Sequence, residues 1–232
     1  MGLLLTTEIE DQVNTQTGKL DEPSDNVELI QAADGLIFDC DGTLADTMPL
    51  HFIAWQNVLT KYGFAFDEDL FYSLGGQPTD RIVGQLSKEQ NISVDVMKVT
   101  DEKEDAFIDL IDQMEPITSI VDVAKQYHGK LPMGVGSGGQ REVVKRILKT
   151  LSIDSLFDCV VGSEDTKLHK PEPDVFLEVA SRLKVEPAKC MVYEDADLGV
   201  EAARRAGMKC FDVREVHTPR RITASESSDG PC

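Results

Sequence analysis

Short apolar runs alternate with amphipathic segments over the second half of the chain. Helical periodicity is expected over residues 119–127, 140–151, 173–183 and 198–206. Strand-like apolar runs are expected over residues 35–43, 131–137, 158–162, 190–195 and 209–213. Because strands alternate with helices of about 10–15 residues, the pattern predicts a parallel sheet with helices on both faces.

A purely helical block interrupts this alternation after the first strand. Its expected helices cover residues 51–62, 67–74, 79–90 and 93–114, separated by Gly, Pro, Asn and acidic positions. We therefore predict an α/β fold, a doubly wound parallel sheet with an inserted all-helical domain. The expected division is a core of residues 34–47 and 117–232, a helical cap of residues 48–116, and an N-terminal tail of residues 1–33. That tail is polar and acidic and is expected to be a loose end or a short surface helix over residues 26–33.

The net charge of the chain limits the classes of molecule that it is expected to bind. The chain has 232 residues with 23 basic and 42 acidic side chains, a net charge of -19 and a pI near 4.5. Such an acidic surface repels polyphosphate backbones and anionic lipid heads, so we expect neither nucleic acid nor a membrane surface as a partner. A small anionic substrate stays compatible, because a pocket can carry its own cations.

The cysteines indicate a reducing environment. The five cysteines are an odd number without metal-ligand spacing, and they predict free thiols rather than a disulfide framework. The first residues lack the basic region of a secretory signal. We expect a cytoplasmic protein, and a monomer.

Polar side chains follow the apolar runs at the positions where strands are expected to end. Asp39 and Asp41 follow the first run, Ser137 follows LPMGVG, and Glu194 and Asp195 follow CMVY. Lys170 lies in HKPEPD between a strand and a helix. In open α/β sheets the ligand crevice lies beyond the carboxyl ends of the strands, so these side chains are expected to meet there.

Several carboxylates at one site require a cation, and oxygen ligands without His or Cys favour a hard ion such as Mg²⁺. A metal beside a lysine and a Ser–Gly turn is typical of a phosphate site. An aspartate is ionised at neutral pH and can attack phosphorus directly, so we assign Asp39 as the nucleophile and Asp41 as the general acid and base. As an acid at neutral pH, Asp41 would need a raised pKa. Taken alone, Asp39 and Asp41 could also belong to a turn with a capping role, because Asp-Gly is common in turns.

Four stretches, in this order, resemble the motifs of the haloacid dehalogenase superfamily: FDCDGTLADT, the Ser137 turn, KPEPDVF and EDADLGVEAARRAGM. The resemblance covers about residues 35–214 and implies a Rossmann-like core with a cap. It implies that Asp39, the backbone carbonyl of Asp41 and Asp195 bind Mg²⁺ with help from Glu194, while Ser137 and Lys170 hold phosphoryl oxygens. The second aspartate matches the phosphatase and phosphomutase branch.

Further stretches, DTMPLHFIAW, GGQPTDRIV and MGVGSGG, resemble the β-phosphoglucomutase-like subgroup, and within it bacterial fructose-1-phosphate and 6-phosphogluconate phosphatases. This resemblance implies a Mg²⁺-dependent phosphatase that acts on a small sugar phosphate through an aspartyl phosphate. Residues 77–81 depart from the mutase pattern. The positions assigned to substrate binding are Gly42, Thr43, His51, Gly76, Gln77, Arg81, Lys103 and Gly138.

Two other functions stay open at this stage. A β-phosphoglucomutase would use the same aspartyl phosphate but pass it to a second sugar hydroxyl, which requires a closed site that excludes water. A non-catalytic sensor of phosphorylated ligands would use the same fold without the chemistry. The filled catalytic positions, Asp41 above all, argue against the sensor.

Overall fold

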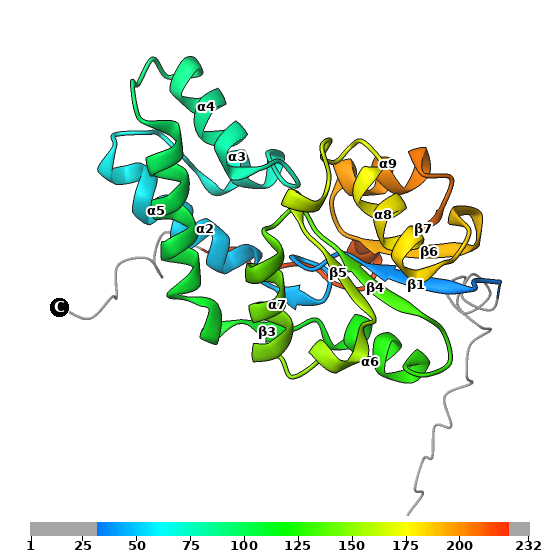
Figure 1. Ribbon diagram of the computed structural model, residues 1–232. Coiled ribbons are helices and arrows are strands. Elements are labelled where there is room, and N and C mark those ends of the chain that lie inside the picture. The colour runs from blue at the N-terminus through cyan, green and yellow to red at the C-terminus, as the bar shows by residue number, and fades with distance from the viewer. Residues whose placement is uncertain (1–31, 223–232) are drawn as a thin grey trace, which may run out of the picture.

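The computed structural model describes residues 32–222, and its centre is a five-stranded parallel sheet. The strands are β1 (Gly35–Phe38), β4 (Met133–Gly136), β5 (Cys159–Val161), β6 (Cys190–Glu194) and β7 (Lys209–Asp212). They lie in the order β5-β4-β1-β6-β7, and every neighbouring pair is parallel (Figure 1). This arrangement confirms the expected doubly wound α/β fold.

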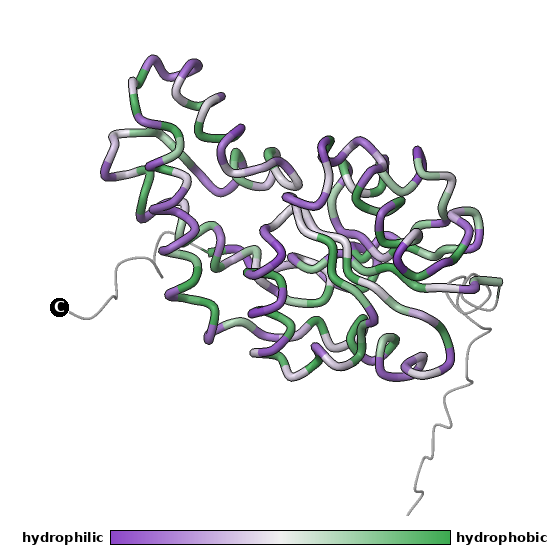
Figure 2. Tube along the Cα trace, in the orientation of Figure 1, coloured by the Kyte–Doolittle hydropathy of each residue, from purple (hydrophilic) through white to green (hydrophobic). Residues whose placement is uncertain are grey.

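Helices cover both faces of the sheet. They are α6 (Thr118–Tyr127) and α7 (Arg141–Thr150) on one face, and α8 (Asp174–Leu183) and α9 (Asp197–Arg205) on the other. Alternate residues of β1 serve the two faces, since Leu36 and Phe38 pack in the core that holds α6 and α7, whereas Ile37 packs with α8 and α9. In Figure 2 the strands carry mostly apolar colours, and hydrophilic positions recur along the helices.

The chain between β1 and β4 forms a separate group of helices, which we call the helical insert (residues 48–113). It comprises α2 (Met48–Lys61), α3 (Glu68–Ser73), α4 (Thr79–Glu89), α5 (Val96–Ile108) and the 3-10 helix η1 (Ile111–Gln113). The insert has an apolar core of its own, in which Phe52, Leu59, Phe71, Val83 and Val99 are buried. It stands to one side of the sheet in Figure 1.

Two helices of the insert differ from the sequence prediction by more than one residue at an end. The helix expected over residues 93–114 is shorter, because the Asp95 carboxylate accepts the Lys98 N–H at 3.2 Å and caps the start of α5. It ends at Ile108, before η1. Helix α2 begins at Met48 rather than at residue 51, because Pro49 suits the first turn of a helix.

A two-stranded ribbon joins the insert to the sheet domain, and the sequence did not predict it. Strands β2 (Ala45–Asp46) and β3 (Glu115–Pro116) pair antiparallel, with Ala45 opposite Pro116 and Asp46 opposite Glu115. The Ile117 N–H extends the contact by donating to the Leu44 carbonyl at 3.0 Å. Two-residue strands are too short to leave a hydrophobic pattern. Both passages between core and insert therefore lie side by side.

Further 3-10 helices complete the described chain: η2 (Asp154–Leu156), η3 (Ser163–Asp165), η4 (Pro187–Lys189) and η5 (Val213–Glu215). The surface helix expected over residues 26–33 lies outside the described residues apart from its last two positions. Cysteines 40, 159, 190 and 210 are free thiols. Within residues 32–222, no helix has both the length and the apolar character needed to cross a membrane.

Candidate active site

The carboxyl ends of three central strands bring the polar residues together. Strand β1 lies between β4 and β6, so Asp39, Ser137 and Glu194 reach the same edge of the sheet. The backbone holds them there, since the Asp39 N–H donates to the Tyr193 carbonyl at 2.9 Å and the Ser137 N–H donates to the Val161 carbonyl at 3.0 Å. All three side chains are buried.

Lys170 lies at the centre of this group. Its Nζ donates to Asp39 Oδ1 at 2.6 Å and to Glu194 Oε2 at 2.7 Å, and it lies 4.9 Å from the ring centroid of Phe176. Burial alone would lower the pKa of Lys170, but the charges of Asp39 and Glu194 raise it above its ordinary value. The ammonium is therefore charged at neutral pH.

The negative charges of the carboxylates outnumber the positive charge of Lys170 beside them. Burial raises the pKa of Asp39 well above its ordinary value, against the attraction of Lys170, and the charges of Glu194 and Asp195 raise it further. Burial and the charge of Glu194 raise the pKa of Asp195 to about 7. Oxygen atoms of Asp39, Glu194 and Asp195 lie within 4.8 Å of one another. A hard divalent cation suits this oxygen-only set and would offset its surplus of negative charge.

Two glycines make room for these carboxylates. A Cβ on Gly42, which has a φ of +79°, would lie 2.2 Å from Asp195 Oδ2, and a Cβ on Gly199 would lie 2.0 Å from Glu194 Cδ. The Thr43 hydroxyl donates to Asp195 Oδ1 at 3.0 Å. We expected Gly42 and Thr43 to bind substrate, but neither lines the pocket described below. Both residues contact or closely approach Asp195, so they help to position it.

Replacing Gly199 by alanine is expected to displace the Glu194 carboxylate. We expect a loss of about 10–100-fold in divalent-cation affinity, since supporting residues of metal sites contribute on that scale. Titration of the melting temperature with Mg²⁺ measures the change. Gly84→Ala is the matched control, because Gly84 is also helical and no atom lies within 4 Å of its added Cβ. Equal Mg²⁺ affinity in the two variants would contradict the prediction.

Asp41 belongs to a second network, which crosses from the core to the insert. Its Oδ1 accepts from Thr47 Oγ1 at 2.7 Å and lies 3.1 Å from His51 Nε2. His51 Nδ1 lies 3.1 Å from Lys103 Nζ, so one neutral tautomer, protonated at Nε2, satisfies both contacts. Burial would raise the pKa of Asp41, but the hydrogen bonds from His51 and Thr47 lower it below its ordinary value. The raised pKa that an acid at this position needs is therefore absent from this arrangement.

The insert supplies the opposite wall. Lys103 is 3% exposed, and its Nζ lies over the rings of Trp55 and Phe107, at 5.4 and 5.5 Å from their centroids. It also lies 3.1 Å from Glu104 Oε1, which accepts from the Thr79 hydroxyl at 2.6 Å. Sequence reasoning missed Thr47, Thr79 and Glu104. Each joins the site through hydrogen bonds to residues that only the folded chain brings close.

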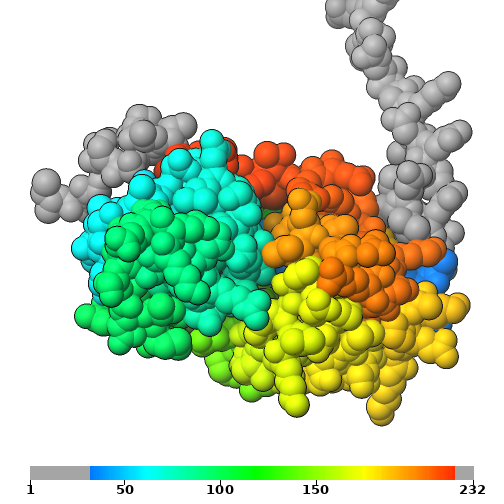
Figure 3. Space-filling view, turned by 90° about the horizontal axis from the view of Figure 1, so that it is seen from above, coloured from blue at the N-terminus to red at the C-terminus, as the bar shows by residue number. Residues whose placement is uncertain are grey.

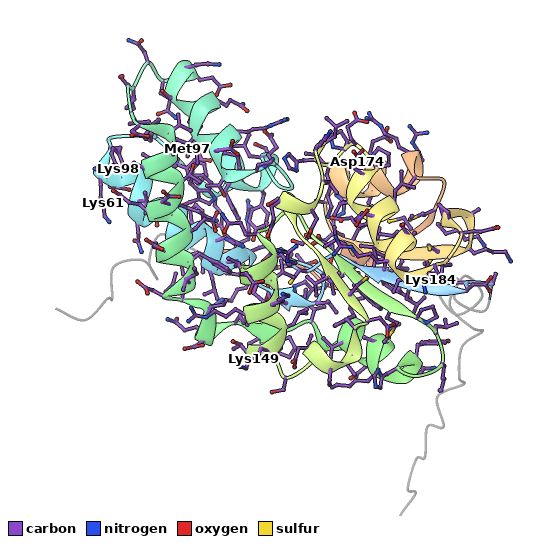
Figure 4. The ribbon with its side chains drawn as sticks, viewed as in Figure 1. Lys61, Met97, Lys98, Lys149, Asp174 and Lys184 are labelled. Atoms are coloured by element: carbon purple, nitrogen blue, oxygen red, sulfur yellow. The ribbon has the colours of Figure 1, made fainter. Side chains whose placement is uncertain are left out.

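A pocket of about 290 Å³ lies between the two walls. The expected residues that line it are Asp39, Asp41, His51, Gly76, Gln77, Lys103, Ser137, Gly138, Lys170, Glu194 and Asp195. Met97 of α5, 59% exposed, also lines it and was not foreseen (Figure 4). Arg81 does not enter this pocket, contrary to our expectation. It lines a shallow groove on α4 with Lys88 and Glu89.

The family comparison matches residues 36–213 to the haloacid dehalogenase-like hydrolases. The chain belongs to this family, and it is an enzyme of the hydrolase type. It is 43% identical to the fructose-1-phosphate phosphatase YqaB of Escherichia coli, over 78% of this chain and 96% of that protein. It is 33% identical to a phosphorylated carbohydrates phosphatase of Thermotoga maritima, over 76% of this chain and 82% of that protein.

The fold also resembles solved structures of this family. The β-phosphoglucomutase of Clostridium difficile superposes with a TM-score of 0.68 and 27% identity, over 77% of this chain and 83% of that one. The β-phosphoglucomutase of Bacillus subtilis is similar in sequence at 26% identity, over 77% of this chain and 82% of that protein. The resemblance to the β-phosphoglucomutase-like subgroup is thereby confirmed.

Proposed function

We propose that this protein is a Mg²⁺-dependent phosphatase that hydrolyses the phosphate ester of a small sugar phosphate through an aspartyl phosphate on Asp39. The observation that carries the proposal is the group at the end of β1 and β6, where Lys170 contacts Asp39 and Glu194 and Asp195 lies beside them. This group can receive a phosphate dianion only if a cation accompanies it. The similarity to phosphatases of phosphorylated sugars supports the substrate class.

Asp39, Glu194, Asp195 and the Asp41 carbonyl would hold the metal. When bound, Mg²⁺ would neutralise part of the negative charge of the carboxylates and the phosphate. Lys170 and the Ser137 hydroxyl, both at the edge of the pocket, would bind phosphoryl oxygens. The chain's own contribution is to hold the buried Asp39 against phosphorus, beside the Lys170 ammonium.

The reaction would proceed in two displacements. An Asp39 carboxylate oxygen forms a bond to phosphorus as the bond between phosphorus and the sugar oxygen breaks, and the leaving oxygen takes a proton from Asp41. A water molecule then attacks phosphorus, gives its proton to Asp41, and releases inorganic phosphate with Asp39 restored.

Asp41 is already suited to accept the proton of the attacking water, because hydrogen bonds from Thr47 and His51 favour its ionised form. To donate a proton to the leaving sugar oxygen, Asp41 must first take one up. This proton uptake requires a change in the surroundings of Asp41, which binding of the substrate would have to bring.

The pocket limits the size and character of the substrate. Its volume of about 290 Å³ is at the small end of ligand pockets, which suits a monosaccharide phosphate. The wall of the insert offers Gln77, Lys103 and Glu104 as partners for sugar hydroxyls, beside the apolar Trp55 and Met97. We propose that residues 48–116 act as a cap that closes over the substrate, with residues 34–47 and 117–232 as the catalytic core, and that the enzyme works as a cytoplasmic monomer.

The test is phosphate release from fructose 1-phosphate, 6-phosphogluconate and β-glucose 1-phosphate, with Mg²⁺ and with a chelator. We expect release from at least one of them, lost on chelation and restored by added Mg²⁺. Release that persists at full rate in the chelator would contradict the metal assignment. Binding of all three without turnover would indicate a sensor.

The likeness to β-phosphoglucomutases makes a mutase the second candidate. It would require the closed insert to keep water from the aspartyl phosphate. Conversion of β-glucose 1-phosphate to glucose 6-phosphate without free phosphate would favour the mutase. Free phosphate and glucose would favour the phosphatase.

A further inference from the structure

The chain after β7 leaves the sheet domain and runs to the helical insert. Val213 of η5 is buried in the core of the sheet domain, whereas the side chain of Ile222 packs against the apolar core of the insert. In Figure 3 the red C-terminal residues lie along one edge, between the orange residues of the core and the cyan residues of the insert. We call residues 216–222 the C-terminal strap.

The strap first meets the ribbon that joins core and insert. His217 Nε2 lies 3.5 Å from Asp46 Oδ1, an ion pair when the imidazole is protonated. Asp46 belongs to β2, and both atoms are buried without a hydrogen-bond partner. The strap therefore covers the place where the chain passes from core to insert.

Its end then binds helix α3 of the insert. The Arg221 guanidinium pairs with Asp69, lies 3.8 Å from Glu68 Oε2 and stacks over the ring of Tyr72 with its Cζ 4.6 Å from the centroid. The Ile222 N–H donates to Glu68 Oε1 at 2.7 Å. Single exposed ion pairs contribute little, but here one guanidinium meets two carboxylates and a ring.

Helix α3 is the support of one wall of the pocket. Phe71 on α3 and Leu74 directly after it line the pocket, and the chain continues into the pocket residues 75–77. This loop approaches the core, where a Cβ on Gly76 would lie 3.4 Å from Leu198 Cβ. A shift of α3 would therefore displace the loop that forms this wall of the pocket.

We propose that the C-terminal strap is a third link between core and insert, beside β2 and β3, and that Arg221 is a positioning residue that holds α3 and residues 75–77 over the site. The inference rests on the proposed function, because it assigns the strap a part in substrate binding. Loss of the link lowers the population of the closed arrangement, which weakens substrate binding more than it slows the chemistry.

The test uses Arg221→Glu in the full chain, which places a third carboxylate against Glu68 and Asp69. We expect KM to rise about three- to fivefold with kcat changed less than about twofold, as the loss of a few ion-pair contacts implies. Asp69→Lys in the same chain restores an opposite pair and should return KM toward the wild-type value. Lys61→Glu, an equal change of charge at an exposed position of α2, is the matched control and should leave KM unchanged.

A second readout needs no turnover. Trp55 is the single tryptophan of the chain, is 2% exposed and lines the pocket, so acrylamide quenching of its fluorescence reports opening of the insert. We expect stronger quenching in Arg221→Glu and recovery in the double variant. If Arg221→Glu lowers the melting temperature but leaves KM and quenching unchanged, the strap only stabilises the fold, and the proposal is overturned. If the wild type releases no phosphate while quenching still changes, the proposed function fails and the link stands.

Discussion

Asp39→Asn is expected to reduce kcat for phosphate release by at least about 10⁴-fold, while the protein stays folded. The amide is nearly isosteric with the carboxylate, but it is neutral and does not form a bond to phosphorus. Asp39 is also a candidate cation ligand and the partner of Lys170 at 2.6 Å, so charge balance at the site changes as well. Steady-state phosphate release and thermal melting, measured on the same preparation, check both parts of the prediction.

The matched control is Asp197→Asn. Asp197 is the first residue of α9, its side chain is 87% exposed, and it pairs with Arg214 at 2.7 Å. The same chemical change at this exposed position should leave kcat within about twofold, because surface substitutions away from special features have small effects. A kcat for Asp39→Asn within tenfold of the wild type would rule out Asp39 as the nucleophile.

Lys170→Met is expected to abolish phosphate release and also to lower the melting temperature by about 5–15 °C. The lysine is buried, and its loss leaves the carboxylates of Asp39 and Glu194 facing each other without their cation, a change that usually costs several kcal/mol. Mg²⁺ should raise the melting temperature of the variant more than that of the wild type, because it replaces the missing positive charge.

Differential scanning calorimetry with and without Mg²⁺ measures this difference. Lys149→Met, on the exposed side of α7, is the control and should leave the melting temperature and its response to Mg²⁺ unchanged. An equal Mg²⁺ response in Lys170→Met and wild type would mean that the cation binds elsewhere.

The sheet could be predicted from the sequence because most of its strands are short, mainly apolar runs bounded by polar or glycine residues. β1 is the clearest case, since GLIF is fully buried and Asp39 follows it directly. The rule for parallel sheets then brought Asp39, Ser137 and Glu194 to one edge without knowledge of the strand order. The helical insert was equally visible, because four helical patterns follow one another without a strand between them.

What could not be predicted depends on contacts between distant residues. The ribbon of β2 and β3 has two residues in each strand and forms only because the chain leaves and re-enters the core at one place. Arg221 meets Asp69 across 152 positions of sequence, and neither residue carries a motif.

The electrostatics of the site also escaped prediction. The direction of the Asp41 pKa shift depends on hydrogen bonds from Thr47 and His51, so the raised value that general-acid chemistry suggested is not what the fold provides. Thr43 likewise has the residue type of a phosphate ligand but bonds to Asp195. Residue type and spacing indicate the chemistry of a site, but they do not assign each polar group to its partner.

The most direct test of the aspartyl phosphate is to trap it on Asp41→Asn with acetyl phosphate, whose leaving group needs no proton. This variant can form the intermediate but lacks the base for its hydrolysis, so the intermediate should accumulate. Borohydride reduces an aspartyl phosphate to homoserine, which peptide mass spectrometry detects. We predict homoserine at position 39, dependent on both Mg²⁺ and acetyl phosphate. If the wild type hydrolyses acetyl phosphate but Asp39 of the variant is not reduced, the proposed mechanism is contradicted.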